Sequence, residues 1–318
     1  MLNIGIENIQ PKVSTETEMP IEELIDFATA VGMYSDEIDQ DFKVLDQHIL
    51  AVENLISVLD NLREHGVTPA IEALVGNQIE LSEASFENFI TEGIKKVVDF
   101  IKGIIKKIKE FFTGKKDETV KKQIDECEQI LNSNDENDKQ KVDEIIERSI
   151  EINVCHVLIE PGADASKPFT TFCNSFKQWG AEVNSNSMSS SAGEGPLATM
   201  QGLVKGIPFT FGRRKTIFES RENIKHCLSK ANSFLSDLKR HVREFERLIP
   251  MLEKNLIEIG DKNDHVTTSA QGLRDLPTVA RLFKDCLHQL NMAIFSLQNS
   301  INNIHRAMKS NGYRALDK

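Results

Sequence analysis

Residues 86–112 read FENFITEGIKKVVDFIKGIIKKIKEFF. Apolar side chains recur there every three or four positions, which is typical of one face of an α-helix, and lysines occupy or flank the other face. The apolar face contains Phe89, Ile94, Val97, Ile101, Ile104, Ile105, Ile108, Phe111 and Phe112, and the basic face contains Lys95, Lys96, Lys102, Lys106, Lys107 and Lys109. The stretch therefore predicts a basic amphipathic helix roughly 40 Å long.

Three environments suit such a helix. An Ile- and Phe-rich face beside lysines is typical of helices that lie in a membrane interface. The lysines alone would suit DNA phosphates, because each contact releases counterions. An ordinary helix of a globular domain would bury the same apolar face in its core. The sequence leaves these three explanations open.

The segment before this helix is strongly acidic. Residues 1–84 contain 17 acidic and three basic residues, whereas residues 85–116 contain eight lysines and four acidic residues. The formal net charge of the whole chain is −11, so the rest of the chain is nearly neutral. Such asymmetry indicates a partner-binding or removable segment.

Three further segments have long helical seams, in which apolar residues alternate in steps of four and three. The first runs over residues 38–59, and the others predict an antiparallel, coiled-coil-like pair over 217–258 and 278–311. Thr216 and Glu219 are expected to cap the second of these helices, and Pro250 to kink it. The fold class predicted from these patterns is all-α.

The middle of the chain is less regular. Residues 118–151 predict two helices, residues 152–159 a short strand or a helix end, and residues 169–179 a helix with an aromatic face. The run NSNSMSSSAGEGP at 184–196 predicts a linker. We therefore expect five segments: an acidic helical leader (1–83), the basic helix (84–116), a helical middle domain (117–183), a linker and hinge (184–215) and a C-terminal helical hairpin (216–318).

We expect neither an enzyme nor a metal or cofactor site. The eight histidines are scattered, the five cysteines form no C-x-x-C pair, and no glycine-rich phosphate loop or G-x-S-x-G motif occurs. Arg213-Arg214-Lys215 could bind phosphate, although a solvated hinge explains it more simply. The first residues have no pattern of a secretory signal, and no apolar run is long enough for an ordinary spanning helix.

The order of these features resembles the internal head proteins of large contractile-tailed bacteriophages. The resemblance covers about residues 35–115 and includes LREHGVTPAIEAL at 62–74, followed by the Lys/Ile/Phe helix. It implies an acidic propeptide that directs the protein, made in the host cytoplasm, into the interior of the assembling capsid. It also implies partners: a prohead protease, capsid or scaffold components, and packaged DNA or an anionic membrane. Release into the host with the DNA would follow.

The resemblance further implies cleavage after Glu in a short small-or-aliphatic–x–Glu motif. Leu81-Ser82-Glu83 lies at the charge boundary and leaves the basic helix whole, so we predict cleavage between Glu83 and Ala84. Glu72, Glu87 and Glu92 end similar motifs and are the alternatives.

Two other functions fit the same sequence. One is a membrane-active or pore-forming helical protein that the acidic leader shields. The other is a cytosolic helical scaffold that forms homo-oligomers through its seams.

Overall fold

The computed structural model describes residues 21–69, 83–113, 115–184, 195–261 and 268–309. Helices dominate these ranges, which confirms the all-α fold. Residues 37–318 form one compact unit, and residues 1–36 form a second unit, of which the beginning of helix α1 is described.

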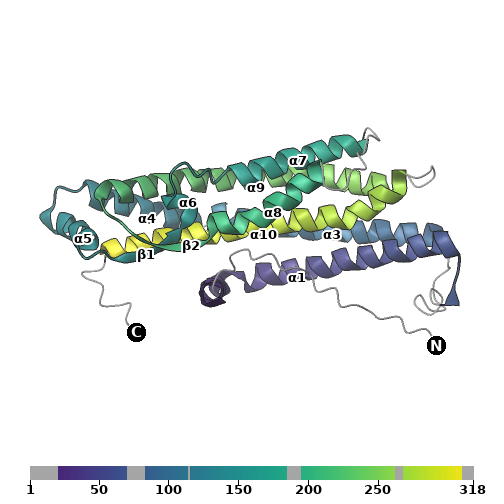
Figure 1. The fold of residues 1–318 in the computed structure, drawn as a ribbon, viewed down its shortest axis with the longest axis horizontal. Coiled ribbons are helices and arrows are strands. Elements are labelled where there is room, and N and C mark those ends of the chain that lie inside the picture. The colour runs from purple at the N-terminus through teal and green to yellow at the C-terminus, as the bar shows by residue number, and fades with distance from the viewer. Residues whose placement is uncertain (1–20, 70–82, 114, 185–194, 262–267, 310–318) are drawn as a thin grey trace, which may run out of the picture. The chain divides into compact units, whose positions relative to one another are not determined.

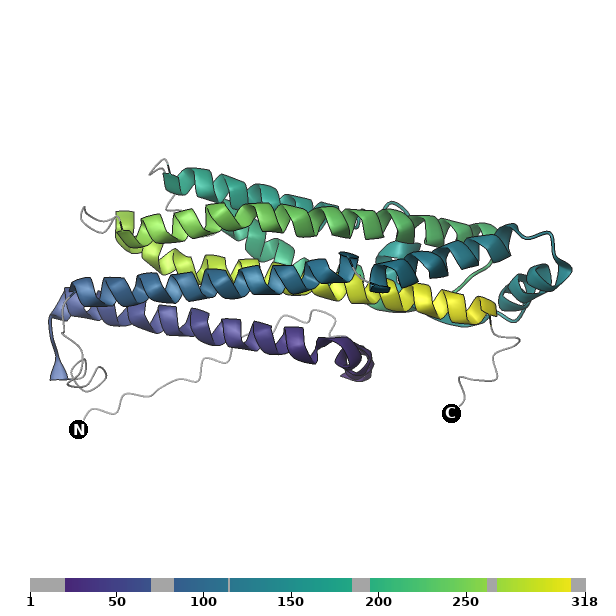
Figure 2. The same cartoon turned by 180° about the vertical axis from the view of Figure 1, so that it is seen from behind.

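Four long helices organise the larger unit: α1 (Ile21–His65), α3 (Glu83–Thr113), α9 (Arg221–Asp261) and α10 (Thr268–Lys309). Helix α3 lies between α9 and the part of α1 that follows Glu37 (Figure 2). The seam of α1 is buried as its spacing predicts, and the helix ends before Gly66. Gly66 has φ +70°, the left-handed conformation that commonly closes a helix at a glycine.

Two short helices follow the basic helix, as predicted. They are α4 (Lys115–Asn132) and α5 (Glu136–Glu147), with the polar break between them. The Asp135 side chain accepts a hydrogen bond from the backbone N–H of Asn137 at 2.7 Å and so caps α5.

An aromatic cluster forms the core where α7 (Lys167–Asn184) meets α9 and α10 (Figure 1). Phe172 of α7 lies against Phe245 of α9 and Phe283 of α10, and Phe176 lies against Phe283, with ring centroids 5.2–6.2 Å apart. Phe245 and Phe283 also contact each other. All four are fully buried, together with Trp179. The predicted aromatic face at 169–179 is therefore a core-packing face.

A two-stranded antiparallel ribbon interrupts the helices. Strand β1 (Glu151–Cys155) pairs with β2 (Arg213–Ile217), and the short helix α6 (His156–Ile159) follows β1. The first half of the predicted 152–159 strand is thus confirmed. Residues 213–215 were expected to be a solvated hinge. They form part of strand β2 only because they pair with β1, which comes from a distant part of the chain.

The expected linker and hinge at 184–215 also contains helix α8 (Pro196–Phe211). Pro196, Met200, Ile207 and Phe211 are buried at helical spacing, and α8 packs on α7 and α10. Proline at the first helical position is a recognised start signal. The preceding Ser/Gly run and the internal Gly206-Ile-Pro sequence obscured this signal.

The two C-terminal helices are neighbours, but a coiled-coil hairpin is not confirmed. Helix α9 also packs on α3 and α7, and α10 packs on β1, α4 and α8. The expected Thr216–Glu219 cap is wrong, because Thr216 lies in β2. Ser220 caps α9 instead, accepting from the Asn223 N–H at 3.2 Å. Helix α10 begins at Thr268, ten residues before the predicted start at 278, so Pro277 lies inside it, as Pro250 lies inside α9.

Candidate binding surface on helix α3

Helix α3 buries nearly all of its predicted apolar face in the bundle. Eight of the nine predicted residues are at most 7 % exposed: Ile94, Val97, Ile101, Ile104, Ile105, Ile108, Phe111 and Phe112. Phe89, 41 % exposed, is the exception. In the intact chain this face is therefore core, so a membrane could contact it only after α3 had separated from its neighbours. Among the described helices, none has a stretch long and apolar enough to span a bilayer.

Four of the six predicted lysines form ion pairs. Lys95 pairs with Glu92 one turn away, at 2.8 Å. Lys102 and Lys109 reach α9, at 3.0 Å from Glu253 and 2.8 Å from Glu246. Lys107 reaches α1, at 2.6 Å from Asp41. The hydrogen bond to Glu253 raises the pKa of Lys102.

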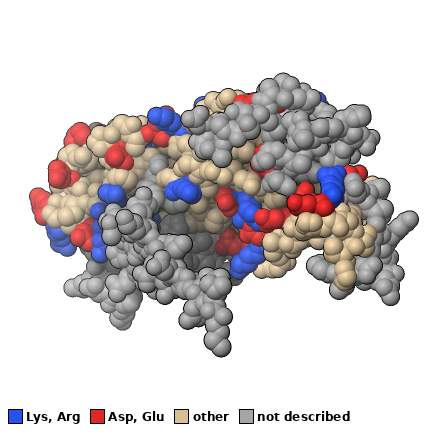
Figure 3. Space-filling view, turned by 45° about the vertical axis from the view of Figure 1, so that its right-hand side comes forward, with Lys and Arg blue, Asp and Glu red and all other residues tan. Residues whose placement is uncertain are grey.

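Lys96 and Lys106 are exposed and form no ion pair with a carboxylate in the described part of the chain. On the face shown in Figure 3, described side chains of both signs lie next to one another and do not form separate patches. The basic face of α3 is therefore largely neutralised within the bundle, with two lysines directed to solvent.

The acidic segment before α3 packs against it, running in the opposite direction. Arg63 of α1 lies 2.9 Å from Glu87 of α3 at one end of this contact, and Asp41 pairs with Lys107 at the other. Between these ends, a Cβ built on Gly93 would lie 2.7 Å from Val52 Cγ2. Gly93 thus permits a close approach of the two helices. The sequence indicates such a contact by a glycine inside a strongly helical pattern, because glycine there destabilises the helix by about 1 kcal/mol relative to alanine.

The opposite flank of α1 contacts α10. Arg281 binds the Glu53 carboxylate through both terminal nitrogens, and Lys284 donates to Asp46. Burial opposes charge on Lys284, but its hydrogen bonds to Asp46 and Asp285 hold its pKa above the ordinary value.

Between these two flanks lies the buried seam of α1. It consists of Ile38, Phe42, Leu45, Ile49, Val52, Ile56, Leu59 and Leu62, each at most 8 % exposed. We call the surface of α3 and α10 beneath it the docking face, marked by Gly93, Phe100 and Lys107 on α3 and by Arg281, Lys284 and His288 on α10. His48 packs on Phe100 and Phe42 on His288, with ring centroids 4.7 and 5.0 Å apart.

The predicted cleavage residues lie in different settings. Glu83 and Ala84 are the first two residues of α3, whereas Glu72 lies outside the described residues. Glu87 and Glu92 are inside α3, each in an ion pair. A further triplet of the same form, Leu158-Ile159-Glu160, spans the end of α6 and its capping residue.

Ser166 and His241 form a buried hydrogen-bonded pair, with 2.7 Å between Oγ and Nε2. Such pairs occur in nucleophilic sites. Here Arg240 also donates to Ser166 Oγ at 2.7 Å, and His241 has no exposed surface. Burial lowers the pKa of His241, which favours the neutral ring. The network therefore joins the start of α7 to α9 and presents no accessible nucleophile.

A second buried polar network joins α4 to α9. Asp117, 6 % exposed at its side chain, accepts from Lys121 at 2.8 Å and from Lys239 at 2.7 Å. Burial by itself would raise the pKa of Asp117, but these two lysines hold it below the ordinary value.

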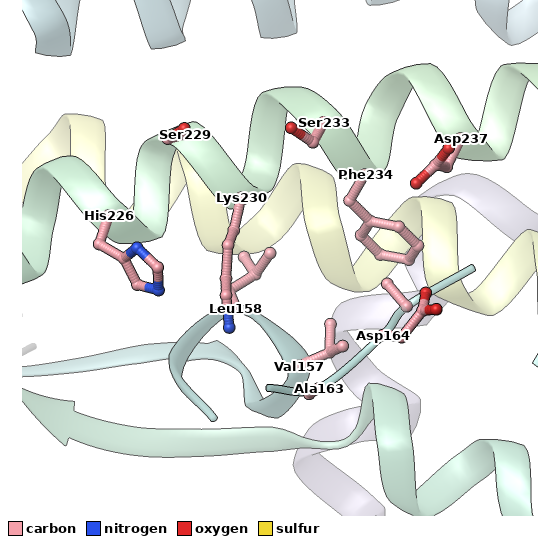
Figure 4. A pocket seen from close by; sticks show the side chains of 11 residues that line it. Val157, Leu158, Ala163, Asp164, His226, Ser229, Lys230, Ser233, Phe234 and Asp237 are labelled. Atoms are coloured by element: carbon pink, nitrogen blue, oxygen red, sulfur yellow. The ribbon is translucent and has the colours of Figure 1, made fainter. Parts of the chain in front are cut away.

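A half-open cavity of about 310 Å³ lies between α9, α6 and the loop that follows α6 (Figure 4). Val157, Leu158 and Phe234 supply its apolar lining. Its charged groups are already engaged: Lys230 donates to the Glu160 carbonyl, and Asp164 accepts backbone N–H groups at the start of α7. Asp237 pairs with Arg240 at 2.8 Å, and His226, Ser229 and Ser233 of α9 supply the remaining polar lining.

The remaining candidate binding residues and the cysteines take part in structural contacts. Within Arg213-Arg214-Lys215, now part of β2, Lys215 lies 3.5 Å from Glu151 of β1. The five cysteines are buried and free, and burial raises the pKa of Cys127 and Cys173 to about 12. No group of His, Cys, Asp and Glu side chains within the described ranges is arranged to hold a metal ion.

Comparison with family models, with curated proteins and with solved structures gives no match to this chain.

Proposed function

We propose that the chain is the precursor of an internal head protein of a contractile-tailed bacteriophage. Its acidic leader directs it into the capsid, a prohead protease removes the leader, and the mature protein is packaged and released with the DNA. The observation that carries this proposal is the packing of the acidic segment after Glu37 on the basic helix α3, with Glu83 at the start of that helix.

The position of Glu83 suits proteolysis better than the positions of Glu87 and Glu92. A protease binds its substrate in an extended conformation, and residues inside a hydrogen-bonded helix must unwind first. Glu83 is the first residue of α3, so unwinding there disturbs only the first turn of the helix. Glu92 lies more than two turns inside the helix. Cleavage at Glu83 also separates the two charge regions of the chain.

Cleavage changes the long-range electrostatics of the protein. Removing residues 1–83 takes away 17 acidic and three basic residues, so the formal net charge changes from −11 to +3. Lys107 also loses its Asp41 partner. A protein that DNA and anionic lipid repel overall would then be weakly attracted to both.

Intact-mass and N-terminal analysis of the protein recovered from purified particles tests this proposal. We expect a mature chain that begins at Ala84. Glu83→Gln should leave a longer chain in the particles, because the resemblance implies that the cut requires the carboxylate. Glu87→Gln is the matched control and should mature normally.

The same measurement separates the alternatives. A chain that begins at residue 1 or 2 in particles contradicts the precursor proposal and favours a scaffold. An intact chain that makes vesicles leak favours a membrane-active protein, since this activity would need no cleavage.

A further inference from the structure

The docking face is complementary to an acidic amphipathic helix in both its apolar and its charged side chains. Its centre receives the apolar seam of α1, and Gly93 lets the helix approach closely. Basic side chains stand on both flanks, Lys107 on α3 and Arg281 and Lys284 on α10, each opposite a carboxylate of α1. Apolar centre and charged rim together are the usual composition of a helix-binding surface.

Loss of the leader would expose this face. The surfaces that eight buried seam residues now cover would become solvent-accessible, and Lys107, Arg281 and Lys284 would lose the partners that α1 supplies. Apolar patches of this kind on a folded protein mark interaction sites. The remaining contacts of α3 with α9 and of α10 with α4 and α8 do not involve α1, so the rest of the bundle keeps its own packing.

We propose that the docking face is a binding site for an acidic amphipathic helix of a partner protein, and that α1 occupies it until this helix displaces the cleaved leader. The partner helix carries apolar residues in alternating steps of four and three, with carboxylates on both sides of the seam. The proposal rests on the proposed function insofar as natural cleavage is what makes the leader displaceable.

Cutting the folded full-length chain isolates the binding step. A recognition sequence for a site-specific protease is placed between residues 70 and 82, outside the described helices, and the purified chain is cut. The probe is a fluorescent synthetic peptide of residues 37–65. We expect the cut chain to bind this peptide, with release of its own leader fragment, and the intact chain to leave the peptide free.

A matched pair of peptides tests the chemistry of the partner. Asp46→Lys with Glu53→Lys alters the two carboxylates that face α10, and binding should weaken about tenfold because two ion pairs become repulsive. The control carries lysines at four exposed positions of α1, which makes the same change in net charge: Gln47→Lys, Asn54→Lys, Ser57→Lys and Asn61→Lys. The control should bind like the natural peptide. Arg281→Glu with Lys284→Glu in the chain should restore binding of the altered peptide.

Several results would overturn the proposal. If both altered peptides bind the cut chain equally weakly, the binding depends on the net charge of the peptide and not on the two carboxylates that face α10. A cut chain that sheds its leader, ignores the natural peptide and binds vesicles of anionic lipid would assign the face to a membrane. A cut chain that forms stable dimers and excludes the peptide would assign it to a second copy. None of these results bears on natural cleavage, which the mass analysis of particles decides separately.

Discussion

Gly93 offers a selective way to test whether α1 packs on α3. Replacing it with alanine places a methyl group where the nearest atom, Val52 Cγ2, is only 2.7 Å away. Val52 is 1 % exposed and β-branched, so its side chain has few other rotamers into which it can move. Gly103 is the matched control, because it lies in the same helix and a Cβ there meets nothing within 4 Å.

The expected magnitudes follow from two opposing effects. Alanine is a better helix former than glycine by about 1 kcal/mol, and this gain applies at both positions. Overpacking a core contact costs about 1–3 kcal/mol, and this cost applies only at position 93. Gly103→Ala should therefore raise the free energy of unfolding by about 1 kcal/mol, whereas Gly93→Ala should leave it unchanged or lower it by up to about 2 kcal/mol.

Amide hydrogen exchange of the full-length protein is the most direct assay. Gly93→Ala should speed exchange in residues 38–62 and leave the amides of α9 and α10 protected, because the methyl group displaces α1 alone. Adding Val52→Ala should recover part of the protection, since the new Cβ then fills space that the valine has vacated. If Gly93→Ala protects α1 as well as Gly103→Ala does, the two helices do not make this contact.

Three further predictions follow. In co-sedimentation, the cut chain freed of its leader should bind anionic vesicles or DNA more tightly than the intact chain, and Lys106→Glu plus Lys107→Glu should reduce this binding. If neither the cut nor the intact chain binds, α3 serves only as core. Asp117→Ala should lower the free energy of unfolding by about 2 kcal/mol in urea unfolding, because it takes the carboxylate away from the partly buried Lys239. Lys139→Ala removes an exposed ion pair and should change this free energy by less than about 0.5 kcal/mol. Burial lowers the pKa of His241 below 6.5, so below that pH the unfolded chain takes up a proton that the folded chain does not. Stability should therefore fall as pH decreases through 6.5, and His241→Gln should make this fall less steep; an equally steep fall would show that other groups cause it.

The sequence predicted the helices that have long seams, and it did so for a physical reason. A four-three spacing shows which face of a helix is buried, because one side of the 3.6-residue repeat must avoid water. The seam of α1, the apolar face of α3 and the aromatic face of α7 are all buried accordingly. The same spacing does not show what covers each face, which is why a coiled-coil hairpin was expected where α9 and α10 each pack on several elements.

The candidate surface was only partly predictable. The apolar face and the lysines of α3 could be listed from the sequence, but their environments depend on contacts between distant residues. Glu53 and Arg281 are 228 positions apart, and nothing local pairs them. Strand β2 was missed for the same reason, since RRKTI becomes a strand only through its partner β1.

The acidic segment before α3 is held on the basic helix by more than its charge. A shield held only by ion pairs would separate at high salt, because exposed pairs contribute little and are screened. Residues 38–62 instead bury eight apolar side chains, an interaction that salt does not weaken. Cutting the chain near Glu83 therefore does not by itself free the docking face, since the leader fragment is still held by its seam. Release requires either dilution or a competitor of the same chemistry, and an acidic amphipathic helix of a partner is the competitor that this face fits.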